Sequence, residues 1–114
     1  MAITPNFAAF DMVDVPVLLL DAQRKLRACN AAFVSRCGRA VEDLLGLDLA
    51  DALAANGVSR LALDQAWELA VLTKRPLAGL DIDACDADGL GWPLRLSGCH
   101  QAMGWVLTDR KSVV

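Results

Sequence analysis

The chain has 114 residues, which is enough for one domain and too few for a second hydrophobic core. Its hydrophobic residues, 55% of the total, exclude a disordered tail, yet no apolar run approaches the ~20 residues that a membrane-spanning helix requires. The formal net charge is −3, which argues against direct contact with nucleic acid, because phosphate binding needs clustered Lys and Arg. The stretch from Met1 to Phe10 lacks the basic region of a secretory leader, so we expect a single acidic domain in the cytoplasm.

Residues 1–14 are predicted to form a short helix ahead of the domain. Thr4 is a good N-cap residue, and Pro5 suits the first helical position. Phe7 and Phe10 would share one face of this helix, because residues three apart lie on the same side.

A β-hairpin is predicted after this helix. A nearly all-apolar strand runs from residue 15 or 17 to residue 20, and a second strand covers residues 26–29 after a polar turn. At Asn30 the period of the apolar residues changes from two to 3.6, and the asparagine side chain suits a helix cap. This pattern predicts a helix over residues 31–37 that ends at Gly38.

Three further helices are predicted, two of them short. The short helices cover residues 41–45 and 49–55, and a glycine follows each of them closely. Ser59 is expected to cap a longer helix that continues to residue 73. One apolar stripe runs along this helix and predicts the face that it buries, formed by Leu63, Ala66, Trp67, Ala70 and Val71.

Three strands complete the chain, because the period returns to two after Pro76. The first two strands lie on either side of a turn at residues 86–89, and each alternates apolar with polar side chains. The last strand covers residues 105–109. Strands that are segregated from helices in this way favour an α+β fold, in which one sheet carries the helices on one face.

The motifs in these elements resemble those of PAS (Per-Arnt-Sim) sensory domains, in the order and spacing of that family. They are residues 15–21 (VPVLLLD), residues 26–30 (LRACN), Leu44-Leu45-Gly46, Asp88-Gly89 followed by Trp92 and Leu94, and residues 104–109 (GWVLTD). The resemblance covers most of the chain. It implies a five-stranded antiparallel sheet with helices packed on one face.

The resemblance also implies how the parts of the chain would work. Residues 15–109 would form the PAS domain, and residues 110–114 would begin a linker to an effector domain that is C-terminal in the parent chain. The N-terminal helix, through Phe7 and Phe10, would form the interface of a homodimer. Asp109, which closes the last strand, would be the point at which a signal leaves the domain.

Six apolar residues are candidates for the wall of a ligand pocket. Trp67 on the long helix and Trp105 on the last strand are the strongest, because ligand pockets have apolar walls with a few polar groups. The alternative is that both tryptophans fill the core. The same two interpretations apply to the other candidates, Phe33, Val71, Leu94 and Leu96.

The predicted function is that of a sensory or dimerisation module in a bacterial signal-transduction or transcription-regulatory protein, such as a histidine kinase. In this role the domain would bind a small molecule in an apolar pocket. The alternatives are a ligand-free protein–protein interaction domain with a filled core, and a small-molecule carrier without an effector. The sequence has no nucleophile elbow, phosphate loop or histidine pair, so we expect no enzymatic activity.

The sequence leaves the identity of a cofactor open but argues against several groups. The reactive-cysteine motif of the family's covalent flavin photosensors is missing, and the long helix has no histidine to bind haem. His100, the sole histidine, is expected at the exposed tip of a hairpin. No metal site is predicted, because the four cysteines form no C-x-x-C pair and the acidic residues 81–89 do not complete an EF-hand loop.

Overall fold

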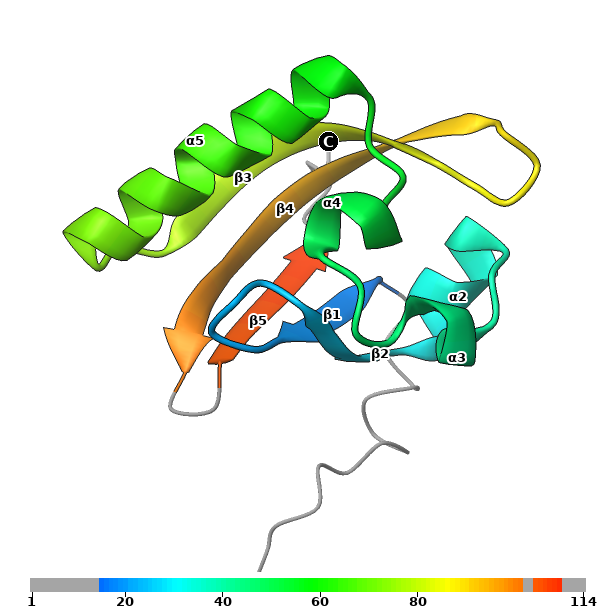
Figure 1. Cartoon of the computed structure of the whole chain (residues 1–114), viewed down its shortest axis with the longest axis horizontal. Helices are drawn as coiled ribbons and strands as arrows, with labels where there is room; N and C mark the ends of the chain where they lie inside the picture. Colours follow the sequence, from blue (N-terminus) through cyan, green and yellow to red (C-terminus); the bar gives the residue numbers. More distant parts are fainter. Residues whose placement is uncertain (1–14, 102–103, 110–114) are drawn as a thin grey trace, which may run out of the picture.

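Residues 15–101 and 104–109, which the computed structural model describes, form a five-stranded antiparallel sheet with helices on one of its faces (Figure 1). The strands lie in the order β2-β1-β5-β4-β3, so the first and last strands of the chain are neighbours. The predicted fold class is confirmed. The predicted N-terminal helix with Phe7 and Phe10, and the predicted linker from residue 110, lie outside the described residues.

The elements follow the predicted order. They are β1 (Val17–Leu20), β2 (Leu26–Cys29), α2 (Ala31–Cys37), α3 (Val41–Leu44), α4 (Leu49–Ala52), α5 (Gly57–Thr73), β3 (Leu77–Cys85), β4 (Gly91–Gln101) and β5 (Gly104–Asp109). Because β4 continues to Gln101, His100 pairs with Trp105 on β5. The histidine is exposed, as predicted, but it lies on a strand and not at a hairpin tip.

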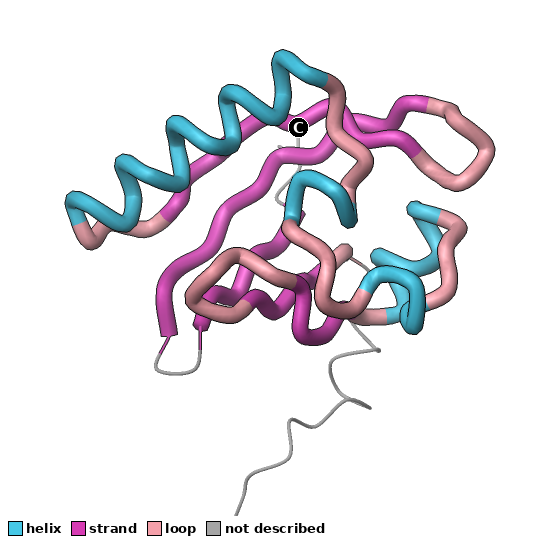
Figure 2. Tube along the Cα trace, in the orientation of Figure 1, coloured by secondary structure: helices cyan, strands magenta, loops and turns pink. Residues whose placement is uncertain are grey.

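The long helix and the short helices cover different parts of the sheet (Figure 2). Helix α5 runs along β3, whereas α2 lies beside β1 and α3 lies beside β2. Among the described residues, no helix combines the length and the apolar character that crossing a bilayer requires.

Helix α2 has the bounds that the sequence predicts, because strong local signals stand at both of its ends. The Asn30 side chain accepts a hydrogen bond from the Phe33 N–H at 3.2 Å, which satisfies one of the free amides of the first turn. At the other end Gly38 adopts a left-handed conformation with φ of 69°, which a glycine reaches at little cost.

Helix α5 begins earlier than predicted. Its N-cap is Asn56, whose Oδ1 accepts a hydrogen bond from the Ser59 N–H at 2.8 Å. The prediction that Ser59 caps the helix is therefore wrong, because a second good capping residue stands three positions before it. The Ser59 hydroxyl instead accepts a hydrogen bond from the Asp83 N–H at 2.9 Å, which fixes the start of α5 to β3.

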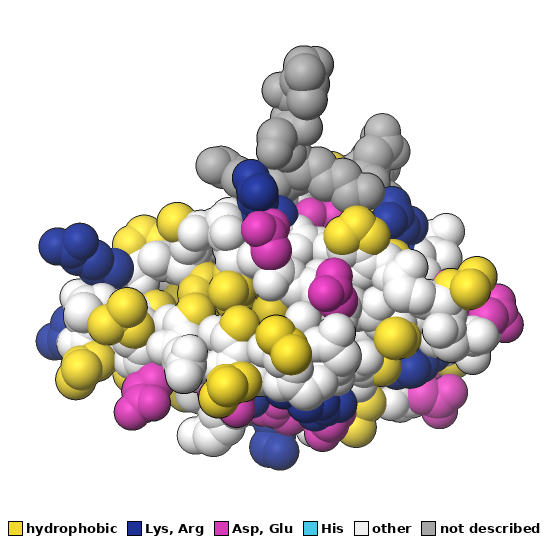
Figure 3. Space-filling view, turned by 90° about the horizontal axis from the view of Figure 1, so that it is seen from above, with side chains coloured by type: hydrophobic (Ala, Val, Ile, Leu, Met, Phe, Trp, Pro, Cys, Tyr) yellow, Lys and Arg dark blue, Asp and Glu magenta, His cyan; other side chains and the backbone are white. Residues whose placement is uncertain are grey.

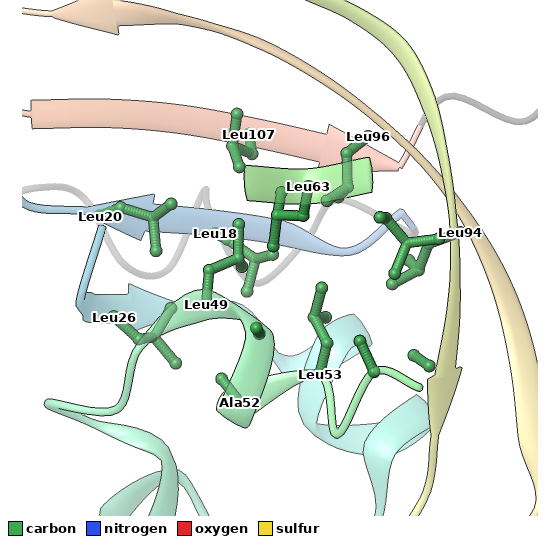
Figure 4. Close-up of a cluster of buried hydrophobic side chains, with 14 of the residues drawn as sticks. Leu18, Leu20, Leu26, Leu49, Ala52, Leu53, Leu63, Leu94, Leu96 and Leu107 are labelled. Atoms are coloured by element: carbon green, nitrogen blue, oxygen red, sulfur yellow. The ribbon is translucent and has the colours of Figure 1, made fainter. Parts of the chain in front are cut away.

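The core fills the space between the sheet and the helices, and leucines dominate it (Figure 4). They come from both layers and are almost fully buried: Leu18 and Leu20 of β1, Leu94 and Leu96 of β4, Leu107 of β5, and Leu49, Leu53 and Leu63 of the helical layer. Branched aliphatic side chains of this kind interdigitate at the density of an organic crystal. The interior is thus held together mainly by the burial of apolar surface.

One residue of the predicted buried stripe does not face the core. Leu63, Trp67 and Ala70 are buried, but Val71 is 53% exposed. Val71 lies eight positions after Leu63 and is rotated from it by about 80° around the helix, which places it at the edge of the buried face. The prediction that Val71 belongs to the buried stripe is wrong.

Candidate functional site

A pocket of about 650 Å³ opens at the C-terminal end of α5, between that helix, the end of β4 and the start of β5. Its volume lies within the range of about 300–1,000 Å³ that is usual for small-molecule sites. The residues that line it are Ala22, Ala70, Val71, Lys74, Arg75, Pro76, Cys99, His100 and Trp105. Two of the predicted candidates, Val71 and Trp105, are therefore brought together at one pocket.

A sharp turn after α5 places the basic residues of this pocket. The chain leaves the helix at Lys74, which adopts a left-handed conformation with φ of 56° and donates its N–H to the Ala70 carbonyl. The Arg75 N–H donates to the same carbonyl at 3.1 Å. These two hydrogen bonds turn the chain back toward β3 and hold both basic residues at the pocket.

Three rings lie in sequence from the core to the pocket. The ring centroids of Trp67 and Trp105 are 4.5 Å apart with an interplanar angle of 42°, and both side chains are almost fully buried. His100 meets Trp105 edge to face, with 5.5 Å between the ring centroids. Trp105 thus forms the apolar wall of the pocket, and Trp67 supports it from the core side.

The other predicted wall residues lie in the core and do not line this pocket. Phe33, Leu94 and Leu96 have at most 2% of their surface exposed. Phe33 contacts the ring of Trp92, with 6.0 Å between the centroids, near the β3–β4 hairpin.

The polar lining of the pocket is basic. Lys74 and Arg75 supply positive charge, His100 supplies a ring nitrogen, and none of the described lining residues carries a carboxylate. This contrasts with the chain as a whole, whose net charge is negative. An apolar wall beside two cations suits a ligand that has an apolar body and an anionic group.

Sequence reasoning missed the basic residues of this pocket. The pair Lys74-Arg75 directly after the long helix was the available signal. The proximity of His100 to that pair arises from the pairing of β3 with β4, which places Leu77 opposite Gly98 and which no local pattern contains.

No metal centre is found in the part of the chain that the structure describes, since none of its His, Cys, Asp and Glu residues gather in threes. The four cysteines form no disulfide bonds in the described part of the chain; Cys37 is buried and the other three are half-buried. They are dispersed over α2, β2, β3 and β4.

Asp109, the predicted exit point, is buried at the end of β5. Its Oδ1 accepts a hydrogen bond from the Arg95 N–H at 2.9 Å, and its own N–H donates to the Pro16 carbonyl at 3.1 Å. The end of β5 is therefore tied both to β4 and to the residue that precedes β1.

Comparison with known families agrees with this architecture. A family model described as "PAS fold" matches residues 10–110. The chain belongs to the PAS family. No curated protein sequence matches it.

Two solved bacterial structures are similar in fold to this PAS domain. One is a domain of the sensory box sensor histidine kinase/response regulator from Geobacter sulfurreducens, with 23% identity, a TM-score of 0.68, and coverage of 91% of this chain and 89% of that one. The other is the LOV protein of Rhodobacter sphaeroides, with 18% identity, a TM-score of 0.74, and coverage of 91% and 62%.

A third similar structure is the PAS domain of a protein from Colwellia psychrerythraea. It has 16% identity and a TM-score of 0.73, and the match covers 92% of each chain. At these identities the likeness is one of fold, and it extends over nearly the whole of this PAS domain.

Proposed function

We propose that this PAS domain is the sensory module of a bacterial signalling protein, and that it binds a small anionic molecule with an apolar body. The observation that carries the proposal is the pocket at the end of α5, with Trp105 as its wall and Lys74 and Arg75 beside it. The similarity in fold to a domain of a sensor histidine kinase supports the signalling role.

Strand β5 offers a direct route from this pocket to the end of the domain. Trp105 and Asp109 lie on the same strand and, because side chains alternate along a strand, on the same face of the sheet. A ligand that binds more tightly to one position of the Trp105 side chain would favour the conformation of β5 that goes with it. Asp109, at the other end of β5, would transmit this change to residues 110–114. We propose an effector domain beyond these residues and a homodimer formed through Phe7 and Phe10.

A second candidate function is that of a ligand-free interaction domain. The observation that favours it is the central core, in which leucines of the sheet and of the helices are almost fully buried. In this case the domain would act through its surfaces alone.

Ligand binding tests the first proposal against the second. The probes are octanoate and phenylacetate, with octanamide and phenylacetamide as uncharged counterparts. We expect the acids to raise the melting temperature of the domain and the amides to have a much smaller effect, because the amides cannot pair with Lys74 and Arg75. Native mass spectrometry of the purified protein would report any ligand that is retained from the cell.

A pocket-filling variant provides the matched control. Val71→Trp places a large ring on the exposed edge of the pocket and is expected to abolish the thermal shift while preserving the fold. Leu90→Trp adds the same ring at an exposed leucine of the β3–β4 hairpin and should leave the shift unchanged. A protein that retains no ligand and responds to none of the acids would favour the interaction domain.

A further inference from the structure

Helix α5 carries a second apolar stripe, on the side that faces away from the core. Val58 is 81% exposed, Leu61 59%, Leu69 60% and Leu72 78%. Figure 3, which views the molecule from the side of α5, shows hydrophobic side chains gathered over this helix. An apolar stripe of this extent on a helix that already buries its opposite face marks an interaction surface.

The spacing of the stripe keeps it on one straight face of the helix. Together with the exposed Gln65, its residues are separated by 3, 4, 4 and 3 positions. Val58 and Leu69 are 11 positions apart, as are Leu61 and Leu72. A repeat of 11 residues corresponds to about 3.67 residues per turn, close to the natural period of the α-helix, so the stripe barely drifts around the axis.

The spacing is symmetric about Gln65, because the next stripe residues lie 4 and then a further 3 positions away in both directions along the helix. A two-fold axis at Gln65 would bring Val58 opposite Leu72 of a second copy and Leu61 opposite Leu69 of that copy. A two-fold interface requires a surface that is complementary to itself in this way. We propose that α5 binds α5 of a second copy of this chain in an antiparallel pair centred on Gln65.

The residue at the centre of the pair fits this arrangement. A glutamine amide has both donors and an acceptor, so Gln65 can form reciprocal hydrogen bonds with Gln65 of the second copy. A polar residue between apolar layers also fixes the register of two paired helices. On one flank Asp64 is held by Arg24, with 2.7 Å between Oδ1 and Nη1, so its charge is compensated within the domain.

The pair is independent of the ligand pocket and small in extent. Ala70, Val71 and Lys74, which line the pocket, lie on the opposite side of α5 from the stripe, since each is rotated from its centre by more than about 100°. The stripe is about 21 Å long, and a single helix face of this length is smaller than the ~800 Å² per partner of a standard interface. The association is therefore weak and depends on protein concentration.

Cysteine cross-linking tests the pair directly. In Gln65→Cys the two introduced thiols would meet at the two-fold axis, and a short bismaleimide should link them into a dimer several-fold more efficiently than it links wild type. Wild type gives the background of the four native cysteines, and Leu90→Cys, at an exposed position far from α5 in the sequence, is the matched control. Cross-linking of Gln65→Cys no greater than that of Leu90→Cys would overturn the proposal.

Loss of the stripe provides the second arm. Adding Leu61→Asp and Leu69→Asp to Gln65→Cys should raise the protein concentration for half-maximal cross-linking at least about 30-fold, because each variant removes an apolar anchor from both copies. Both leucines are exposed, so the melting temperature should stay close to that of wild type. Adding Phe7→Glu should leave the Gln65 cross-link intact. Cross-linking that is lost with Phe7→Glu, or that persists with both aspartates, would refute the α5 pair.

Discussion

Arg24 and Asp48 are joined by two parallel hydrogen bonds, with 3.0 Å between Nε and Oδ1 and 2.9 Å between Nη2 and Oδ2. The third contact of the same guanidinium is to Asp64 on α5. One side chain in the β1–β2 turn therefore holds the start of α4 and the middle of α5. Burial alone would lower the pKa of Arg24, but its hydrogen bonds to the two carboxylates outweigh burial and raise that pKa. Burial would likewise raise the pKa of Asp48, but the hydrogen bonds from Arg24 and from the Ala50 N–H lower it.

Asp48→Asn isolates the charge in this contact, because the amide oxygen can still accept the N-cap hydrogen bond from the Ala50 N–H. We expect the free energy of unfolding to fall by about 1 kcal/mol at pH 7, and by about 2 kcal/mol in Asp48→Ala, which also loses the cap. Urea unfolding measures both. Asp64→Asn is the matched control, and because that side chain is 58% exposed against 29% for Asp48, its effect should stay below about 0.5 kcal/mol.

The effect of Asp48→Asn should also depend on pH. The pKa of Asp48 is lower in the folded protein than in the unfolded chain, so its contribution is fully present above the unfolded pKa of about 4. The contribution is lost as the pH falls through the folded pKa, so the difference between wild type and Asp48→Asn should shrink below pH ~4. A difference of the same size at pH 7 and pH 2 would contradict this account.

Asn30 joins three segments of backbone from a fully buried position. Its Oδ1 accepts hydrogen bonds from the Val17 N–H at 2.9 Å and from the Phe33 N–H, and its Nδ2 donates to the Val15 carbonyl at 2.8 Å. Asn30→Ala should lower the free energy of unfolding by about 2–3 kcal/mol, because buried polar groups of the backbone lose their partner.

Asn30→Asp separates the contribution of the hydrogen bonds that Oδ1 accepts from that of the hydrogen bond that Nδ2 donates. At pH 7 the carboxylate retains the two accepted hydrogen bonds, but it is a buried charge and cannot donate to the Val15 carbonyl. Burial raises the pKa of such a carboxyl group, and its protonated form again has a donor. The loss of stability relative to wild type should therefore become smaller at low pH. Denaturant unfolding at pH 7 and pH 4 checks this. An Asp variant that loses more stability at the lower pH would refute the assigned role of Nδ2.

Gly98 is required on β4 because the neighbouring strand passes too close for any side chain. A Cβ atom there would lie 1.9 Å from the Val106 carbonyl oxygen and 2.7 Å from Cδ2 of Leu107. Gly98→Ala should lower the free energy of unfolding by at least about 3 kcal/mol, since backbone of a central strand would have to move. Gly91→Ala on the same strand, where the nearest atom is 3.8 Å away, should change it by less than about 0.5 kcal/mol. Equal melting temperatures for the two variants would contradict this.

The contrast between α2 and α5 shows which features of the fold could be predicted from the sequence alone. Asn30 and Gly38 are local signals, and they predicted α2 with its observed bounds. In α5 two apolar stripes compete, one through Leu63 and Trp67 and one through Leu61 and Leu72. Periodicity identifies such stripes, but the face that meets the sheet is decided by contacts with strands that are distant in the sequence.

The basic lining of the pocket and the Arg24 contacts escaped prediction for the same reason. Lys74 and His100 line the same pocket because α5 turns sharply at its end and β3 pairs with β4. Arg24 and Asp64 are 40 positions apart, and their contact needs the whole helical layer to be in place. The resemblance to PAS domains provided the sheet and the order of its elements, whereas these side-chain contacts belong to this sequence.

Asp109 offers a test of both stability and signal transfer. Asp109→Ala removes the acceptor of the Arg95 N–H and should lower the free energy of unfolding by about 1–3 kcal/mol, whereas Asp109→Asn retains an acceptor and should lower it less.

Residue-specific amide exchange adds the functional readout. If ligand binding at Trp105 is transmitted along β5 to Asp109, octanoate should slow hydrogen exchange of the Arg95 amide in wild type. The same ligand should have little effect on that amide in Asp109→Ala, while its stabilisation of the Trp105 side of the pocket persists. An octanoate effect on the Arg95 amide that is equally large in Asp109→Ala would show that the signal leaves the sheet by another route.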